Sequence, residues 1–438
     1  MAVRGVAVAA ISRLLQNVGE AVSARQKLAK KRSLQVVNEH FEPIFNAAMA
    51  TQVVFQQSAS RCAFWLLLCL AGTTYGAVLP EDRADLLYHS YDGGGVTIQG
   101  PSVLVRKAFA DTVSVSANYY VDKVTGASID VEASASAYVE ERIETSVGVD
   151  YLYDSTLMSL SYSTSNENDY QAKTIGFSVS QDFFGDLTTL SLGYSLGDDT
   201  IGRNDEADFA ESLQRRRYSL SLTQVLTKSW IVALNAESVV DEGYLNNPYR
   251  SVRYLDNGDY FYQREQYPGT RNSDALALRS MVYLPYRAAV KTELRGFTDS
   301  WGIEAHNLLL SYTHPFRERW LFEGKVRYYQ QTQADFYADL YPFIDAQNFL
   351  ARDKELSTFN STSYGLGFSY QFESAWLSAF DSRKISLFWD HIIFDYDNFR
   401  NLLVNDADPG EEPRYDPGEE PLYGFNANVL RLFVSFTY

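Results

Sequence analysis

The chain has 438 residues, of which 14% are aromatic, including 31 Tyr and 26 Phe, a composition that favours β-strands. No apolar run reaches the roughly 18 residues of a spanning helix, which excludes a helical membrane protein but not a transmembrane barrel, whose strands expose only alternate residues to lipid. Residues 1–76 hold 8 of the 38 Lys and Arg and 3 of the 55 Asp and Glu, so 77–438 carry 30 against 52, a net charge of −22 that excludes nucleic acid as a partner.

The N-terminal part has the pattern of a secretory signal peptide. In residues 49–76 a positive charge precedes a continuous apolar run, and small residues follow, which predicts cleavage after Gly76. Because a signal starts close to its apolar run, we interpret Met49 as the true start and 1–48 as the product of a misassigned start codon, with a real helical extension as the alternative. Both cysteines lie inside the signal, so the exported part, 77–438, has no disulfide and no thiolate metal site.

Several segments of the exported part alternate between apolar and small polar residues, which is the pattern of β-strands. In 189–196, Leu and Tyr side chains alternate with Thr, Ser and Gly, and 174–180, 218–223 and 363–372 repeat the pattern. A soluble antiparallel sheet usually carries Lys, Glu and Arg on its wet face, whereas this polar face consists of Ser, Gly and Thr. The pattern therefore predicts a lumen of small polar groups and a lipid-facing wall.

Short and long connections alternate strictly between these strands. Short turns, as at 110–111 and 185–186, alternate with longer polar stretches, as at 240–273, 331–361 and 397–424. Outer-membrane barrels have this parity, because their periplasmic turns are short and their surface loops are long. The sequence therefore predicts an all-β fold, a transmembrane antiparallel up-and-down β-barrel of about 16 strands, within a range of about 14 to 18.

The last strand ends on an aromatic residue. Leu432, Val434, Phe436 and Tyr438 share one face of the alternating C-terminal segment. This ending resembles the strand signal that the barrel-assembly machinery reads in outer-membrane proteins. Together with the signal peptide and the loop parity, it predicts the outer membrane of a Gram-negative bacterium as the location, with outer-membrane lipid and the assembly machinery as partners.

Charged residues alternate on two neighbouring upward strands. The two sets are Lys291, Glu293 and Arg295, and Glu323, Lys325 and Arg327. Because the opposite face of the second strand is apolar and aromatic, we expect these charges to point into the lumen. Lumen charges can line a channel and select ions, or they can pair with each other and close it. The mixed signs slightly favour pairing.

The sequence predicts no catalytic residue and no metal centre. None of the four histidines of the exported part has metal-ligand spacing, and no G-x-S-x-G elbow stands at a strand-to-helix turn, so an enzyme is the least favoured class. A tandem acidic octapeptide at 408–423 could hold Ca²⁺ loosely through its carboxylates, but it lacks the regular spacing of a calcium loop. We therefore expect a solvated loop there and no cofactor.

Five short motifs suggest a family. They are Tyr120-Val121-Asp122, Thr125-Gly126-Ala127-Ser128, Ser165-Asn166-Glu167-Asn168-Asp169-Tyr170, Asn247-Pro248-Tyr249-Arg250 and Pro268 to Arg271. Over roughly 84–438 the chain resembles an uncharacterised proteobacterial outer-membrane barrel family, domain of unknown function 3570. The resemblance implies periplasmic thioredoxin-like or flavin-transferring proteins as partners, whose redox chemistry a cysteine-free barrel would host and not perform.

One of these motifs offers polar side chains on a short surface loop. Glu167, Asp169 and Tyr170 could bind a cation or clamp a neighbouring loop, and of the available interpretations we prefer simple loop packing. Two function classes follow for the whole barrel: we expect a pore or transporter, and the alternative is a non-conducting barrel that docks periplasmic or surface partners. A pore or transporter for a small solute or metal ion requires an open lumen. A non-conducting structural or docking barrel requires a lumen filled by paired charges and infolded loops, with the aromatic-rich stretches 240–273 and 331–361 as the plugs.

Overall fold

The part of the chain that the structure describes begins after the predicted signal. The computed structural model describes residues 78–126, 129, 138–374, 379–405 and 414–438. The predicted extension at 1–48, the signal peptide at 49–76 and the first residues of the acidic octapeptide lie outside this part. Within the described ranges, no helix is both long and apolar enough to cross a membrane.

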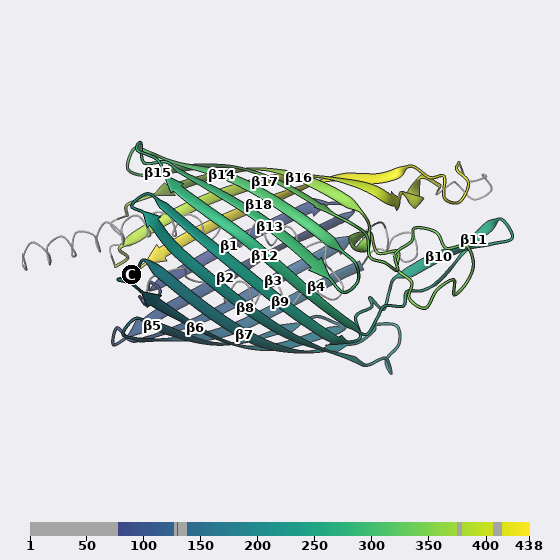
Figure 1. Ribbon diagram of the computed structural model, residues 1–438, viewed down its shortest axis with the longest axis horizontal. Helices are drawn as coiled ribbons and strands as arrows, with labels where there is room; N and C mark the ends of the chain where they lie inside the picture. The colour runs from purple at the N-terminus through teal and green to yellow at the C-terminus, as the bar shows by residue number, and fades with distance from the viewer. Residues whose placement is uncertain (1–77, 127–128, 130–137, 375–378, 406–413) are drawn as a thin grey trace, which may run out of the picture. The chain divides into compact units, whose positions relative to one another are not determined.

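Sixteen antiparallel strands close into a barrel, as the sequence predicted (Figure 1). The strands are β1 (Arg83–Gly93), β2 (Val96–Phe109), β3 (Val113–Gly126), β4 (Tyr138–Tyr153), β5 (Thr156–Asn166), β6 (Tyr170–Phe183), β7 (Thr188–Ile201), β8 (Glu211–Thr227), β9 (Trp230–Gly243), β12 (Thr270–Tyr283), β13 (Ala289–Asp299), β14 (Glu304–Phe316), β15 (Trp320–Gln331), β16 (Phe359–Gln371), β17 (Ser382–Arg400) and β18 (Leu422–Thr437). Each pairs with its neighbours in the chain, except that β9 pairs with β12. The barrel closes where β1 pairs with β18, from Arg83 opposite Thr437 to Gly93 opposite Ala427.

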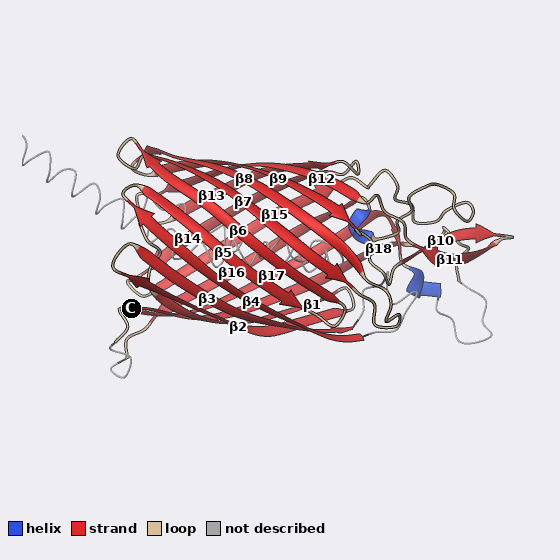
Figure 2. Cartoon of the chain, turned by 90° about the horizontal axis from the view of Figure 1, so that it is seen from below, coloured by secondary structure: helices blue, strands red, loops and turns tan. Residues whose placement is uncertain are grey.

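The two ends of the barrel differ in their connections. At one end the turns are short, and several depend on left-handed backbone: Ala110 and Asp111 have φ of 52° and 55°, which mirror-image hairpin turns require. At the other end long segments gather beyond the strands (Figure 2). We call these the short-turn end and the long-loop end.

The longest loop contains a hairpin that the sequence did not predict. We expected loop structure throughout 240–273, but β9 continues to Gly243, and β10 (Ser251–Asp256) and β11 (Asp259–Arg264) form a separate two-stranded sheet at the long-loop end (Figure 1). The polar tip Asn257-Gly258, with φ of 53° and 94°, provides its tight turn. Charged residues in both strands hide the alternation of apolar and polar side chains that would predict them. Such residues are allowed here because the hairpin packs against other loops and does not face lipid.

Alternate side chains divide the barrel wall into an outer face and a lumen face. On β6, Ile175 and Phe177 are exposed on the outside, whereas Thr174 and Gly176 are buried in the lumen. On β5 every lumen position from 159 to 165 is a serine, and the positions between them are Leu160, Tyr162 and Thr164. The outer face is therefore apolar and aromatic, as the predicted lipid-facing wall requires.

Candidate functional site

An apolar layer lies in the lumen near the long-loop end. Its strand residues come from both sides of the barrel and include Tyr91, Val96, Ile98, Val124, Tyr170, Ile201, Leu213, Phe359, Ile392, Phe394 and Val429. Between them pack Phe336, Tyr337 and Leu356, which belong to the loop that joins β15 to β16. Because contacting apolar side chains at interior packing density leave few voids larger than a water molecule, we expect this layer to exclude water and ions.

A cluster of buried ion pairs, which we call the loop cap, ties the long loops together. Arg253 of the β10–β11 hairpin forms an ion pair with Glu420 at 2.5 Å, and both side chains are 0% exposed. The guanidinium also pairs with Asp339 and donates from Nε to the Asp339 carbonyl at 2.9 Å. Although burial opposes it, the hydrogen bonds and charges of Glu420 and Asp339 raise the pKa of Arg253 above its ordinary value.

Two further arginines extend the loop cap. Arg352 pairs with Asp339 at 3.0 Å and donates to the Arg400 carbonyl at 3.0 Å. Arg250 pairs with Asp353, and both are buried. These contacts join three connections that are remote in the chain, namely 244–269, 332–358 and 401–421. The cap thus fixes the loop residues that complete the apolar layer beneath it.

The motif at 165–170 lies on the same end of the barrel and contacts the loop that contains a second family motif. The Tyr249 hydroxyl donates to the Asp169 carboxylate and accepts from the Asn204 N–H at 2.8 Å. Burial and the hydrogen bond to Asp169 raise the pKa of Tyr249 well above its ordinary value. Tyr170 is buried and donates to Asp199 at 2.5 Å.

Carboxylates converge beside this contact. Oxygen atoms of Glu140, Glu167 and Asp169 all lie within 4.8 Å of one another. Oxygen ligands suit Ca²⁺, and these three are the carboxylates among the described residues that could hold such an ion in this way. Arg142 on the same strand as Glu140 provides a compensating positive charge nearby.

A charged belt follows the apolar layer towards the short-turn end. The structure places the six charged candidates at the positions of β13 and β15 that alternate with the outer side chains: Lys291, Glu293, Arg295, Glu323, Lys325 and Arg327. Their close partners come from other strands. Glu293 binds Arg279 of β12 at 2.7 Å, and Lys325 binds Asp390 of β17 at 2.9 Å.

The belt continues around the barrel with residues that the sequence analysis missed. Asp390 also pairs with Arg431 of β18, and Arg215 of β8 pairs with Asp241 of β9 at 2.6 Å. Arg295 approaches Glu237 of β9 at 3.9 Å. A lone charge at a lumen position of an alternating strand, such as Asp390, was the signal that could have identified them.

A second group of the belt lies on β1, β3 and β4. Asp122 accepts a hydrogen bond from His89 Nε2 at 2.7 Å and pairs with Arg142 at 3.0 Å. The Tyr120 ring stacks on the His89 imidazole with ring centres 4.9 Å apart. Both Tyr120 and Asp122 belong to a motif of the family resemblance, so that motif supplies lumen contacts.

Serines cover the wall opposite the densest part of the belt. In the strand order, β5 lies across the barrel from β15. The lumen faces of β5 to β8 carry the partly exposed hydroxyls of Ser159, Ser161, Ser163, Ser178, Ser180, Ser191, Ser219 and Ser221. Hydroxyls both donate and accept hydrogen bonds without carrying charge. The lumen face of β5 is therefore neutral and polar, and the charged residues of the belt lie on other strands.

The C-terminal residues lie on the closing strand pair. Leu432 and Leu430 are exposed on the outer face of β18, and Val434 and Phe436 pair with Leu86 and Ala84 of β1. The Tyr438 hydroxyl donates to the Arg106 carbonyl at 3.1 Å. The predicted assembly signal thus forms the outer surface of the seam where the barrel closes.

Comparison with known proteins identifies the family. A family model described as "Protein of unknown function (DUF3570)" matches residues 131–382. The chain belongs to the DUF3570 family. This agrees with the resemblance of its sequence motifs, and no curated protein matches the DUF3570 chain.

Three solved structures with similarity to this DUF3570 protein are distant from it in sequence. The siderophore receptor PirA from Pseudomonas aeruginosa is 11% identical, with a TM-score of 0.41, and the match covers 82% of this chain and 63% of the receptor. A bacterial polysaccharide outer membrane secretin is 9% identical, with a TM-score of 0.43 and coverage of 82% and 100%. A FadL homologue from Pseudomonas aeruginosa is 9% identical, with a TM-score of 0.38 and coverage of 82% and 91%. The chain thus spans less than two thirds of the length of the siderophore receptor.

Proposed function

We propose that this DUF3570 barrel resides in the outer membrane and is closed at its cell-surface end. It serves as a docking barrel for periplasmic partners and not as a constitutively open pore. The apolar layer carries this proposal, because ions and polar solutes do not cross a packed apolar layer without large desolvation costs. The continuous apolar outer face supports the membrane location.

The chemistry of the lumen below the layer supports the proposal of a periplasmic partner. Its serine wall and charged belt are reached from the short-turn end, which faces the periplasm in outer-membrane barrels. Hydroxyls and paired charges offer hydrogen bonds to a polar protein segment at low desolvation cost. The family resemblance adds thioredoxin-like and flavin-transferring proteins as the partners to examine first.

A gated transporter for a small solute or metal ion is the second candidate. It is favoured by the loop cap, because the cap consists of ion pairs between loops and so can separate without breaking the barrel wall. In that function the apolar layer is the gate, and the charged belt selects what passes after the gate has opened.

Conductance in a planar bilayer tests the proposal. We expect the refolded wild-type barrel to be silent, and a variant with 334–356 replaced by a short Gly-Ser linker to give stable steps. Steps from the wild-type protein at resting voltage would contradict the docking barrel and favour the pore. Steps that appear only when a solute is added would favour the gated transporter.

A further inference from the structure

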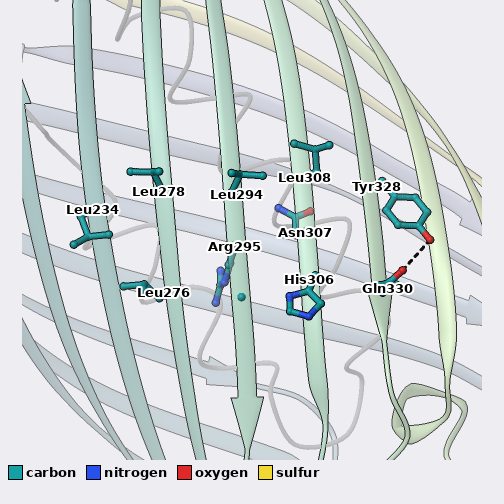
Figure 3. Close-up of a pocket in the computed structure, with 11 residues that line it drawn as sticks. Leu234, Leu276, Leu278, Leu294, Arg295, His306, Asn307, Leu308, Tyr328 and Gln330 are labelled. Atoms are coloured by element: carbon teal, nitrogen blue, oxygen red, sulfur yellow. Dashed lines mark hydrogen bonds between the residues drawn. The ribbon is translucent and has the colours of Figure 1, made fainter.

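A groove interrupts the outer wall of the barrel at β9 and β12 to β15 (Figure 3). Its volume is about 490 Å³, which falls within the range of about 300–1,000 Å³ of ligand sites. Arg295 and Asn307 contribute to its lining, but most of its walls are outward-facing apolar side chains: Leu234, Leu276, Leu278, Leu294, Leu308 and Tyr328. Because these residues are exposed on the lipid-facing side of the strands, the groove opens towards the membrane and not towards the lumen.

A glycine creates the groove. Gly296 faces outward on β13 between Leu276 on one neighbouring strand and His306 on the other. A Cβ placed there would meet a single atom, the His306 Nδ1, at 4.0 Å, so the position opens onto empty space. A glycine inside a strand weakens the strand and often marks the close approach of another molecule.

One end of the groove is polar. His306 and Gln330 follow Gly296 across β14 and β15, and the Tyr328 hydroxyl donates to Gln330 Oε1 at 3.1 Å (Figure 3). The adjacent row, one step along the strands, consists of leucines and Tyr328. A molecule that fills the groove must therefore be apolar along most of its length and accept or donate hydrogen bonds at one end.

Two carboxylates lie beyond the polar end. In the next row towards the long-loop end, Asp274 of β12 and Glu304 of β14 flank Thr298 of β13. Both acidic residues are exposed on the outer face. Neighbouring strands are about 4.8 Å apart, so the backbones that carry the two carboxylates are about 10 Å apart. Two negative charges on neighbouring positions of one face favour a cationic group beside them and disfavour an anionic one.

We propose that this groove binds one acyl chain of a membrane lipid that carries an ammonium group, and phosphatidylethanolamine is the lipid that tests it. The chain lies among the leucines, the ester region meets His306 and Gln330, and the ammonium group lies near Asp274 and Glu304. The inference rests on the proposed membrane location, since the groove is continuous with the lipid-facing wall and only a membrane component reaches it.

Native mass spectrometry of the full barrel, released from detergent with equal amounts of phosphatidylethanolamine and phosphatidylglycerol, tests the inference. We expect one retained lipid, with phosphatidylethanolamine preferred about three- to tenfold, the range that two exposed charge contacts can give. Gly296→Leu fills the groove and should abolish retention. Gly324→Leu is the matched control, because Gly324 also faces outward on open space but does not line the groove.

The headgroup contact has its own variant. Asp274→Asn with Glu304→Gln should keep the bound chain but remove the preference for the ammonium lipid. Equal retention by Gly296→Leu and Gly324→Leu would overturn the groove as a site, and a dimer that dissociates only in Gly296→Leu would replace the lipid by a second copy of the chain. Insertion of each variant into vesicles of the two lipids, followed by protease protection, separates the outcomes. A barrel that does not insert overturns the proposed function as well. An inserted barrel without lipid preference overturns this inference alone.

Discussion

The apolar layer and the charged belt occupy adjacent levels of one lumen, yet they are built from opposite chemistry. The layer needs loop residues to complete it, because inward strand residues alone cannot reach across the bore. The belt needs none, because long Arg and Lys side chains find carboxylates on neighbouring strands. Closure of the lumen by the apolar layer therefore depends on the loops, whereas the ion pairs of the charged belt form without them.

Removing an ion pair of the loop cap should have the largest effect on closure of the lumen. Arg253→Ala leaves Glu420 buried without its guanidinium, and removal of one partner of a buried ion pair costs about 3–5 kcal/mol. We expect the loops to open, with faster proteolysis of 332–358 and the appearance of conductance steps. Arg264 on the same hairpin is 64% exposed and pairs with Glu206. Arg264→Ala should therefore cost less than about 1 kcal/mol of stability. Equal proteolysis of the two variants would contradict the role of the cap.

Truncation of one ring in the layer should have a somewhat smaller effect. Phe336 is 7% exposed and packs against Tyr267 and Trp301. We expect Phe336→Ala to lower the free energy of unfolding of the loop by about 3 kcal/mol, measured by hydrogen exchange of its amides. Phe343 in the same loop is 56% exposed, so Phe343→Ala is the matched control and should change little. Similar losses in both variants would show that the loop, and not the layer, determines stability.

The belt can be examined once the cap is open. In the variant with 334–356 replaced, Lys291→Gln with Arg327→Gln removes two positive charges from the lumen wall, so we expect a shift of several-fold towards cation selectivity. Reversal potentials in a salt gradient measure that shift. An unchanged selectivity would place the conduction path away from this wall.

The contact between Tyr249 and Asp169 predicts a small effect that depends on pH. Because the pKa of Tyr249 is raised in the folded protein, the stabilisation is fully present below the unfolded pKa of about 10 and is lost as the pH rises through the higher folded value. Tyr249→Phe should cost about 1 kcal/mol between pH 6 and 9, and wild type should approach the variant only at more alkaline pH. Proteolysis of 244–250 across this range is the measurement, and a wild-type loop that loosens below pH 9 would contradict the assignment.

Local patterns in the sequence were sufficient for the barrel, because alternation and loop parity are properties of consecutive residues. The loop cap could not be predicted in this way, since Arg253 and Glu420 lie 167 residues apart and meet only after the barrel has closed. The charged face of Lys291 and Lys325 was predicted by alternation. Their partners were not, because the identity of a cross-strand neighbour depends on a register that no single strand reveals.

The hairpin tip at Asn257-Gly258 has a practical consequence. The β10–β11 hairpin projects at the long-loop end (Figure 1), and its tip residues do not contribute to the apolar layer. Exposed turns of this kind tolerate inserted sequence better than packed segments do. A foreign epitope placed between Asn257 and Gly258 should therefore be displayed to antibodies on whole cells, which would make the protein a scaffold for surface presentation of peptides.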